Sequence, residues 1–227
     1  MHAPRDGKFI KIPHIALMIR QCNFILFDLG GVIIDLDYKK TYQELHKLAM
    51  IKNSSIDHKL IIDEIAQNFE QGLISTELFI NKILHHSQPS VHAKEVIDAW
   101  NAMLLDIPEK RLHWLQRLSQ HFSIGILSNT NALHIKWVNH FLQKQYGKED
   151  FYQYVPNTFF SHDLGDRKPN PSIYRKVASR LGLPTHQILF IDDNLQNVSA
   201  ALSTGMHALH SPEQIEIMDQ LRPYLDV

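Results

Sequence analysis

The chain has 227 residues, of which 44% are hydrophobic and 21% are charged, and its formal net charge is -1. This composition is ordinary for a globular protein, and the length suits one main domain that carries an insertion. The near-neutral charge provides no field suited to nucleic acid or to an anionic membrane, so the sequence predicts no polymeric partner.

The single cysteine, Cys22, excludes an intrachain disulfide and a cysteine-based metal cluster, which favours a reducing compartment and a cytoplasmic location. Residues 1–21 form an N-terminal extension whose apolar run, residues 15–19, is too short for a membrane span and has no signal-peptide cleavage site. We expect this extension to be either an added edge strand or a loose segment.

The first strong structural signal is the apolar run from Phe24 to Phe27, which stops at the carboxylate of Asp28. A continuous apolar run is typical of a parallel strand that is covered on both faces. Gly30 and Gly31 follow it, and glycines allow a sharp turn and a close approach of a ligand to the backbone. The simpler interpretation is a strand whose final Asp only caps a turn.

The next segment, residues 37–106, changes to helical periodicity and predicts four successive helices. They are expected to begin near Tyr38, at Asp57 as an N-cap, near Ser75 and near Ser90. Four helices without a strand indicate a small helical bundle inserted after the first strand. A fifth helix, opened by Pro108, should lead back to the sheet.

The remainder alternates between strands and helices. We expect strands at 123–127, 157–161, 188–191 and 207–210, and helices at 131–146, after Pro171, through Val198 to Gly205 and at the C-terminus. Alternation of this kind predicts an α/β fold with a doubly wound, right-handed parallel sheet. The core should therefore comprise residues 22–36 and 107–227, and residues 37–106 should form a separate helical unit.

Three of the apolar strands end in polar residues: Asp28, the pair Ser128-Asn129, and the pair Asp192-Asp193. In a doubly wound sheet, ligands bind beyond the carboxyl ends of the strands, so these groups should converge at one edge. A single such ending is often only a turn. Three endings of the same kind favour a functional site.

Three carboxylates in one pocket would repel one another unless a cation intervened, and an all-oxygen ligand set favours Mg²⁺. Lys168, in the polar loop 162–171, adds a positive charge, and Ser128 supplies a hydrogen-bond donor for phosphate oxygens. A nucleophile, a metal and a cation are the components that phosphoryl transfer requires.

Four segments in this order, FILFDLGGVIIDLD, GILSNTN, GDRKPNP and ILFIDDN, closely resemble the motifs of the haloacid dehalogenase-like (HAD) hydrolase superfamily. The resemblance covers about residues 22–210 and places the helical insertion where this superfamily carries its C1 cap. Within the superfamily the chain looks most like bacterial glucose-1-phosphate phosphatase-type proteins, which similarly have glycine two residues after the first Asp.

The resemblance implies a fold, an activity and a role for each motif residue. It implies a Rossmann-like HAD core and a Mg²⁺-dependent phosphatase that acts on a small phosphorylated metabolite, such as a sugar phosphate. Asp28 would be the nucleophile that forms an aspartyl-phosphate, Ser128 and Asn129 would bind the substrate, and Lys168 would stabilise the phosphoryl group. The metal would be held by a set of four residues: Asp28, the Gly30 carbonyl, Asp193 and, as a helper, Asp192.

The chain departs from the superfamily pattern at Gly30. Most phosphatases of the superfamily have a second Asp there, which protonates the leaving alkoxide and then activates water. General acid–base help is worth about 10²–10⁴-fold in rate, so its loss should slow poor leaving groups most. Asp35 or Asp37 would be a substitute if either reached the site, although a solvated position is the more ordinary expectation.

Two further functions stay open. The weakened general acid–base apparatus is compatible with a regulator that binds a phosphorylated ligand or a protein without turnover. The dehalogenase branch resembles this chain and needs no metal, but its members use an aromatic residue where this chain has Gly30. The sequence leaves the substrate and the oligomeric state undetermined.

Overall fold

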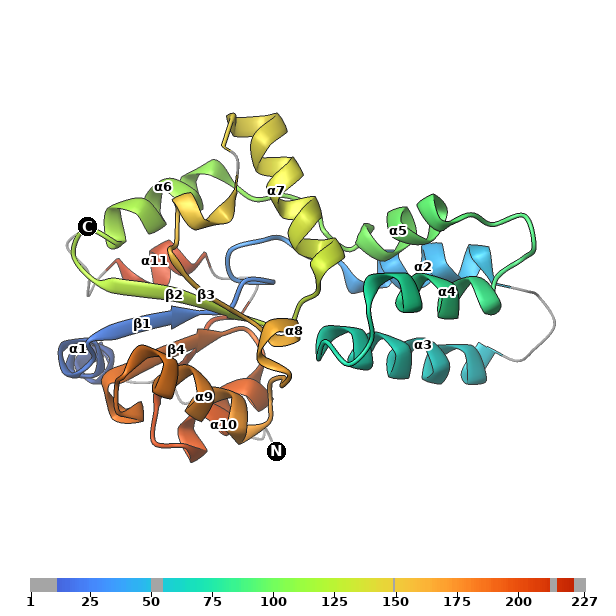
Figure 1. Ribbon diagram of the computed structural model, residues 1–227. Helices are drawn as coiled ribbons and strands as arrows, with labels where there is room; N and C mark the ends of the chain where they lie inside the picture. The colour runs from blue at the N-terminus through green and yellow to red at the C-terminus, as the bar shows by residue number, and fades with distance from the viewer. Residues whose placement is uncertain (1–11, 50–54, 149, 213–215, 223–227) are drawn as a thin grey trace, which may run out of the picture.

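The structure is a computed structural model that describes residues 12–49, 55–148, 150–212 and 216–222 (Figure 1). The core contains five strands, β1 (Phe24–Phe27), β2 (Ser123–Ser128), β3 (Asn157–Phe160), β4 (Ile188–Asp192) and β5 (His207–His210). The helices of the core are α1 (Ile12–Gln21), α6 (Glu109–Leu118), α7 (Ala132–Tyr146), α8 (Ser161–Leu164), α9 (Pro171–Leu181), α10 (Leu195–Ser203) and α11 (Ile217–Leu221). Two short 3₁₀ helices, Phe151–Gln153 and Thr185–Gln187, precede β3 and β4.

The five strands form one parallel sheet in the order β3-β2-β1-β4-β5, which confirms the predicted fold class. Alternate residues of β1 point to opposite faces: Ile25 and Phe27 join the apolar cluster under α6 and α7, and Phe24 and Leu26 join the cluster under α9 and α10. Figure 1 shows these two helix layers above and below the sheet. Coverage of both faces explains why the strand is apolar at every position.

Residues 12–21 adopt neither of the two forms that we expected for the N-terminal extension. Residues 12–21 form helix α1, in which Met18 and Ile19 are buried against the core while Leu17 is 52% exposed. Two adjacent buried residues suit a helix face, whereas a half-covered edge strand would bury alternate residues. Cys22, which follows the helix, is buried as a small hydrophobic side chain. Residues 1–11 lie outside the described ranges.

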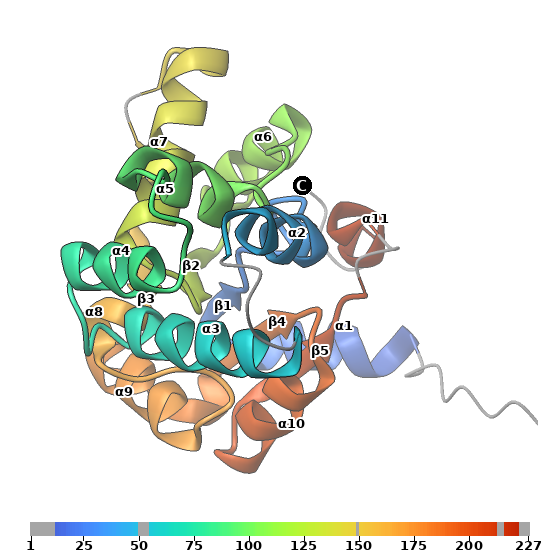
Figure 2. The ribbon, with the colours of Figure 1, turned by 90° about the vertical axis from the view of Figure 1, so that its right-hand side faces the viewer.

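The insertion after β1 forms four helices, α2 (Tyr38–Leu48), α3 (Ser55–Glu70), α4 (Thr76–His85) and α5 (Ala93–Asn101). Helix α3 begins at Ser55, so Asp57 is inside the helix and is not its N-cap as predicted; the N-cap preference of Asp does not fix a helix start by itself. The four helices share an apolar cluster of their own, which contains Phe69, Phe79 and Trp100. Figure 2 shows this helical cap in front of the carboxyl ends of the strands.

Two neighbouring chain segments connect the cap to the core. Backbone hydrogen bonds join Asp35 N to Asp106 O at 2.9 Å, Leu105 N to Asp35 O at 3.0 Å and Asp37 N to Met103 O at 2.9 Å. The departing and returning segments therefore lie side by side. The cap boundaries at residues 37 and 106 stay a prediction, and these paired segments are the observation that favours them.

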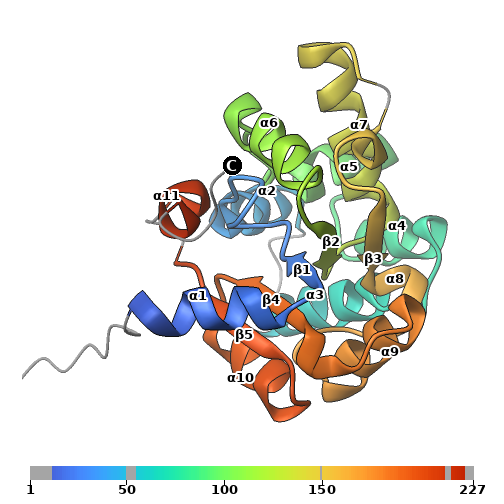
Figure 3. The same cartoon turned by 90° about the vertical axis from the view of Figure 1, so that its left-hand side faces the viewer.

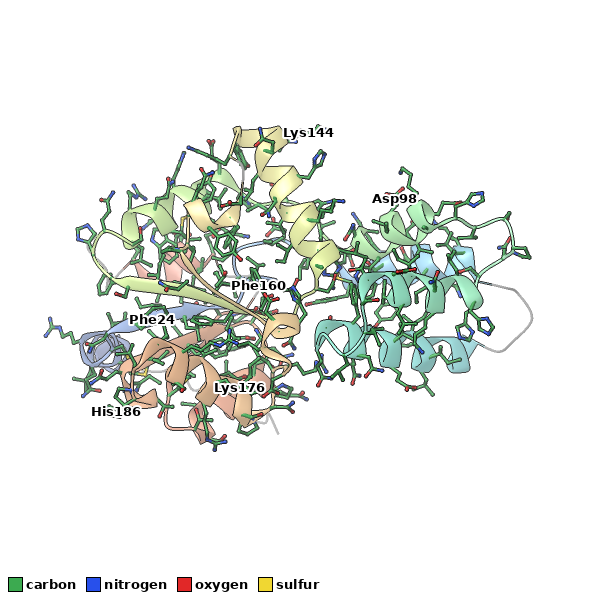
Figure 4. All side chains as sticks on the ribbon, in the orientation of Figure 1. Phe24, Asp98, Lys144, Phe160, Lys176 and His186 are labelled. Atoms are coloured by element: carbon green, nitrogen blue, oxygen red, sulfur yellow. The ribbon has the colours of Figure 1, made fainter. Side chains whose placement is uncertain are left out.

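The sheet has two different ends. Figure 4 shows Phe24, the first residue of β1, at the end of the sheet that is far from the cap. It shows Phe160, the last residue of β3, at the end that lies near the cap. Figure 3 shows α1 at the opposite side of the molecule from the cap, across β4 and β5. Within the described ranges, no helix has the length and apolar character that a membrane crossing requires.

Candidate active site

The polar residues at three strand ends meet at the edge of the sheet that faces the cap. Parallel pairing puts Phe27 opposite both Ile126 and Ile191, so the residues that follow these strands emerge at the same level. Asp28, Asp192 and Asp193 each offer an oxygen atom, and these atoms lie within 4.8 Å of one another. The predicted convergence of these carboxylates is therefore present in the structure.

Lys168 lies between two of these carboxylates. Its Nζ atom is 2.8 Å from Asp28 Oδ1 and 2.7 Å from Asp192 Oδ2, and its side chain is only 1% exposed. Burial opposes the lysine charge, but the two carboxylates outweigh this effect and raise the pKa of Lys168. Burial also raises the pKa of Asp28, although the charge of Lys168 counteracts it. The site therefore concentrates charge where little water is present.

Asp192 is surrounded by hydrogen-bond donors. Its Oδ1 accepts from the backbone N of Asn194 at 2.7 Å, and the side-chain amide of Asn197 donates to both carboxylate oxygens, at 3.1 and 3.0 Å. The residue is fully buried and does not line the cavity described below, whereas Asp193 does. This geometry suits Asp192 to holding Lys168 in place. Sequence reasoning missed Asn197, because a polar residue on a helix carries no sign of the carboxylate that it faces.

Asn129 anchors the loop that carries Lys168. Its side-chain amide donates to the carbonyl oxygen of Lys168, and the backbone N of Lys168 donates to Asn129 Oδ1, both at 2.9 Å. Ser128, the last residue of β2, is buried and lines the cavity. The amide of Asn129 is thus committed to the protein, and its predicted contact with substrate stays a prediction.

The space beside Gly30 is filled by Leu36, in the segment that leads from β1 to the cap, and by Tyr38, the first residue of α2. A Cβ atom at position 30 would overlap with Leu36 Cδ1 and would lie 3.9 Å from the hydroxyl of Tyr38. Neither candidate substitute for the general acid lines the cavity: Asp35 pairs with Arg111 at 2.7 Å, and Asp37 accepts a hydrogen bond from Lys39 N as the cap of α2. The site therefore has no second Asp at position 30, and Leu36 and Tyr38 fill the space where its side chain would lie.

A cavity of about 360 Å³ connects these groups with the cap. The sequence-predicted residues that line it are Asp28, Gly30, Ser128, Asn129, Lys168 and Asp193. Sequence reasoning did not identify several others, among them Leu36, Tyr38, Glu70, Met103, Leu104, His134 and Arg167. Phe69 and Trp100 do not line the cavity and lie in the apolar interior of the cap. The cavity size suits a small ligand.

The comparison with protein families decides the classification. Residues 23–205 match the model of the haloacid dehalogenase-like hydrolases. The chain belongs to this family. Its cap and core, and the four motif segments around the cavity, are therefore those of a HAD-like hydrolase, as the resemblance implied.

Similar proteins come from bacteria and fungi. D-ribitol-5-phosphate phosphatase of Bacteroides thetaiotaomicron is 26% identical over 181 residues, which is 80% of this chain and 87% of that protein. A sesquiterpene phosphatase of Aspergillus oryzae is 25% identical over 199 residues, covering 87% of this chain and 93% of its own. The crystal structure of a HAD-family enzyme of B. thetaiotaomicron in complex with magnesium and inorganic phosphate has a TM-score of 0.78 at 30% identity, covering 88% of this chain and 100% of that one.

Proposed function

We propose that this HAD-like hydrolase is a Mg²⁺-dependent phosphatase that hydrolyses a small phosphorylated metabolite through an aspartyl-phosphate on Asp28. The observation that carries the proposal is the position of Asp28 in the lining of the cavity, with Lys168 Nζ 2.8 Å from its carboxylate and Asp193 within reach of the same cation. The named phosphatases among its relatives and the magnesium–phosphate complex of a similar enzyme support it.

The donor set fits Mg²⁺. Carboxylate oxygens of Asp28 and Asp193, with the carbonyl of Gly30, would hold the ion, and Asp192 would support the site through Lys168 and Asn197. Three carboxylates and one lysine leave net negative charge, which a divalent cation offsets. When bound, Mg²⁺ would neutralise charge on the phosphate oxygens.

The protein groups supply the remaining steps of the reaction. A carboxylate oxygen of Asp28 attacks phosphorus, the bond from phosphorus to the alcohol oxygen breaks, and the departing alkoxide takes a proton from water. Lys168 and Ser128 hold the phosphoryl oxygens during this transfer. Water then attacks phosphorus, which releases inorganic phosphate and regenerates Asp28. The cap over the cavity limits the access of bulk water.

Gly30 makes this chemistry depend on the leaving group. Because Gly30 has no proton to donate and neither Asp35 nor Asp37 lines the cavity, esters with good leaving groups should react best. An anomeric sugar phosphate has a comparatively good leaving group. A glucose-1-phosphate type of substrate is therefore a hypothesis beside the polyol phosphate named for a relative.

Phosphate release in the presence of Mg²⁺ tests the proposal. Purified protein should hydrolyse p-nitrophenyl phosphate and a panel of sugar and polyol phosphates, and a hydroxylamine-sensitive phosphoenzyme should form. Asp28→Asn should lower the rate by about 10³-fold or more. Asp98→Asn is the matched control, because Asp98 is an exposed residue of the cap that pairs with Lys94 away from the cavity.

Two other results would favour the alternative functions. Binding of phosphate esters without turnover, even after long incubation, would indicate the regulator. Chloride release from a haloacid that a chelator does not affect would indicate a metal-independent dehalogenase. Activity that survives Asp28→Asn would exclude Asp28 as the nucleophile.

The cytoplasmic location stays a prediction from the sequence.

A further inference from the structure

One wall of the cavity contains an ion pair that joins the cap to the core. Glu70 is the last residue of α3, and Arg167 precedes Lys168 in the core. Arg167 Nη2 lies 3.2 Å from Glu70 Oε2, and the two side chains are 27% and 19% exposed. Figure 1 shows the end of α3 beside α8, and both residues line the cavity. The pair is therefore part of the surface that a bound substrate meets.

Backbone contacts hold the end of α3, where Glu70 lies, against the core. Ser161 Oγ, at the start of α8, lies 2.5 Å from the carbonyl oxygen of Glu70. Gly72 has a φ of +68°, and a Cβ there would overlap the carbonyl oxygen of His162. Such close contact between backbones requires glycine. The carboxylate of Glu70 is thus presented to the cavity from a fixed position.

The pair leaves hydrogen-bonding capacity unused. Among the described residues, the guanidinium of Arg167 makes one side-chain hydrogen bond, to Glu70, although it has five N–H donors. Its Nε atom is buried without a partner. Glu70 Oε1 also has no hydrogen-bond partner in the described part of the chain. Donor and acceptor atoms therefore lie side by side on this wall.

The charges of the pair cancel, which decides the kind of ligand that it suits. A second anionic group on the substrate would be repelled by Glu70 as it was attracted by Arg167, so the wall offers little net attraction to an anion. An alkyl chain would cover both charged groups, exclude the water that hydrogen-bonds to them and offer no hydrogen bond in return. Such burial of charged groups is unfavourable. Hydroxyl groups can donate to the carboxylate and accept from the guanidinium at once.

We propose that Glu70 and Arg167 bind the hydroxyl groups of the alcohol part of the substrate, and so select polyol or sugar phosphates over phosphorylated acids and alkyl phosphates. The apolar residues Leu36, Met103 and Leu104, which also line the cavity, would contact the C–H faces of the same molecule. This inference rests on the proposed phosphatase function, because it assigns the recognition half of the same cavity.

A matched series of phosphate esters tests the selection. The series is ribitol 5-phosphate, ribonic acid 5-phosphate and n-pentyl phosphate, with p-nitrophenyl phosphate as a substrate that lacks aliphatic hydroxyls. The wild-type enzyme should show the highest kcat/KM for the polyol phosphate among the three aliphatic esters. Glu70→Gln should lower that value by about 10- to 100-fold and should change p-nitrophenyl phosphate hydrolysis by less than about threefold.

The same variant should also change the order of preference. With Gln at position 70, the charge of Arg167 is no longer compensated, so the ratio of the acid ester to the polyol ester should rise. Glu64→Gln is the matched control, since Glu64 is exposed on the same helix and does not line the cavity. It should leave the whole series unchanged.

Binding to a variant that cannot turn over separates recognition from chemistry. In an Asp28→Asn background, Glu70→Gln should weaken ribitol 5-phosphate binding about tenfold and leave inorganic phosphate binding unchanged. A wild-type enzyme that prefers the alkyl or acid ester, or a ratio that Glu70→Gln leaves within twofold, would overturn the selection while leaving the phosphatase function standing. Hydrolysis of none of the esters, p-nitrophenyl phosphate included, would overturn both the selection and the phosphatase function.

Discussion

Asn129 and Lys168 exchange two amide hydrogen bonds of 2.9 Å, which tie the end of β2 to the loop that carries the central lysine. Because the side chain of Asn129 both donates and accepts, it mimics a backbone pairing. The lysine side chain can then reach Asp28 and Asp192 at 2.8 and 2.7 Å. The position of Lys168 is therefore set from both its backbone and its side chain.

Replacing Asn129 should disturb this arrangement in a way that depends on the substitute. Asn129→Asp keeps an acceptor for Lys168 N but places an anion against the carbonyl of Lys168, and we expect a loss of about 10-fold or more in kcat with p-nitrophenyl phosphate. Asn81→Asp, at an exposed position of α4 outside the cavity lining, is the control. Equal rates for Asn129→Asp and wild type would show that the amide pair does not position Lys168.

Removing a carboxylate from the proposed metal site should raise the Mg²⁺ requirement. Asp193→Asn keeps the size of the side chain but removes its charge, so the Mg²⁺ concentration for half-maximal activity should rise by about 10- to 100-fold. Mg²⁺ should also raise the melting temperature of the wild type, because it binds the folded state, and should do so less for the variant. Asp163→Asn, whose exposed side chain lies outside the cavity lining, is the control. An unchanged Mg²⁺ titration would exclude Asp193 as a ligand.

Acid should destabilise the protein through His134, which is buried at the contact between α5 and α7. Its Nε2 lies 3.4 Å from the carbonyl oxygen of Trp100 and its Nδ1 lies 3.2 Å from Asn131 Nδ2, so neutral imidazole satisfies both partners. Burial lowers the pKa of His134 to about 4. The unfolded chain, with an ordinary His pKa, binds the proton first as pH falls. The stabilisation is therefore complete above about pH 6.5 and is lost between about pH 6.5 and pH 4.

Urea unfolding at two pH values measures this effect. Between about pH 7.5 and pH 5, the His134 contribution to the unfolding free energy should fall by about 2 kcal/mol. His134→Gln should remove that part of the pH dependence, although it also lowers stability at neutral pH. His140→Gln, at an exposed position of the same helix, should retain it. Parallel losses in wild type and His134→Gln would show that His134 is not responsible.

The packing around Gly30 should make any side chain costly there. Gly30→Ala should lower the unfolding free energy by about 1–3 kcal/mol, because the new Cβ meets Leu36 Cδ1. In a Leu36→Ala background the same change should cost less than about 1 kcal/mol, since space has been made. A double-mutant cycle by urea unfolding measures this coupling. Additive losses would mean that Leu36 moves aside without cost.

Strand polarity allowed the centre of the site to be predicted from the sequence. Asp28, Ser128 and Asp192 each end or follow an apolar strand, and parallel pairing brings such ends to one edge whatever the surroundings. The four cap helices were also predictable, because an amphipathic period reports which face is buried. These features depend on local periodicity and on one general rule of sheet topology.

Only the tertiary structure decided which distant residues meet the site. Glu70 pairs with Arg167 across 97 positions of the chain, and Asp35 turns to Arg111 across 76. A helical period does not indicate which loop lies opposite the end of a helix, and a carboxylate in a turn does not reveal the cation that it pairs with. The sequence by itself determined that Asp28 follows a buried strand at the ligand-binding edge of the sheet. Packing of the cap on the core determined which residues form the cavity wall and which side chains fill the space beside Gly30. The sequence does not show these partners, because they depend on three-dimensional proximity.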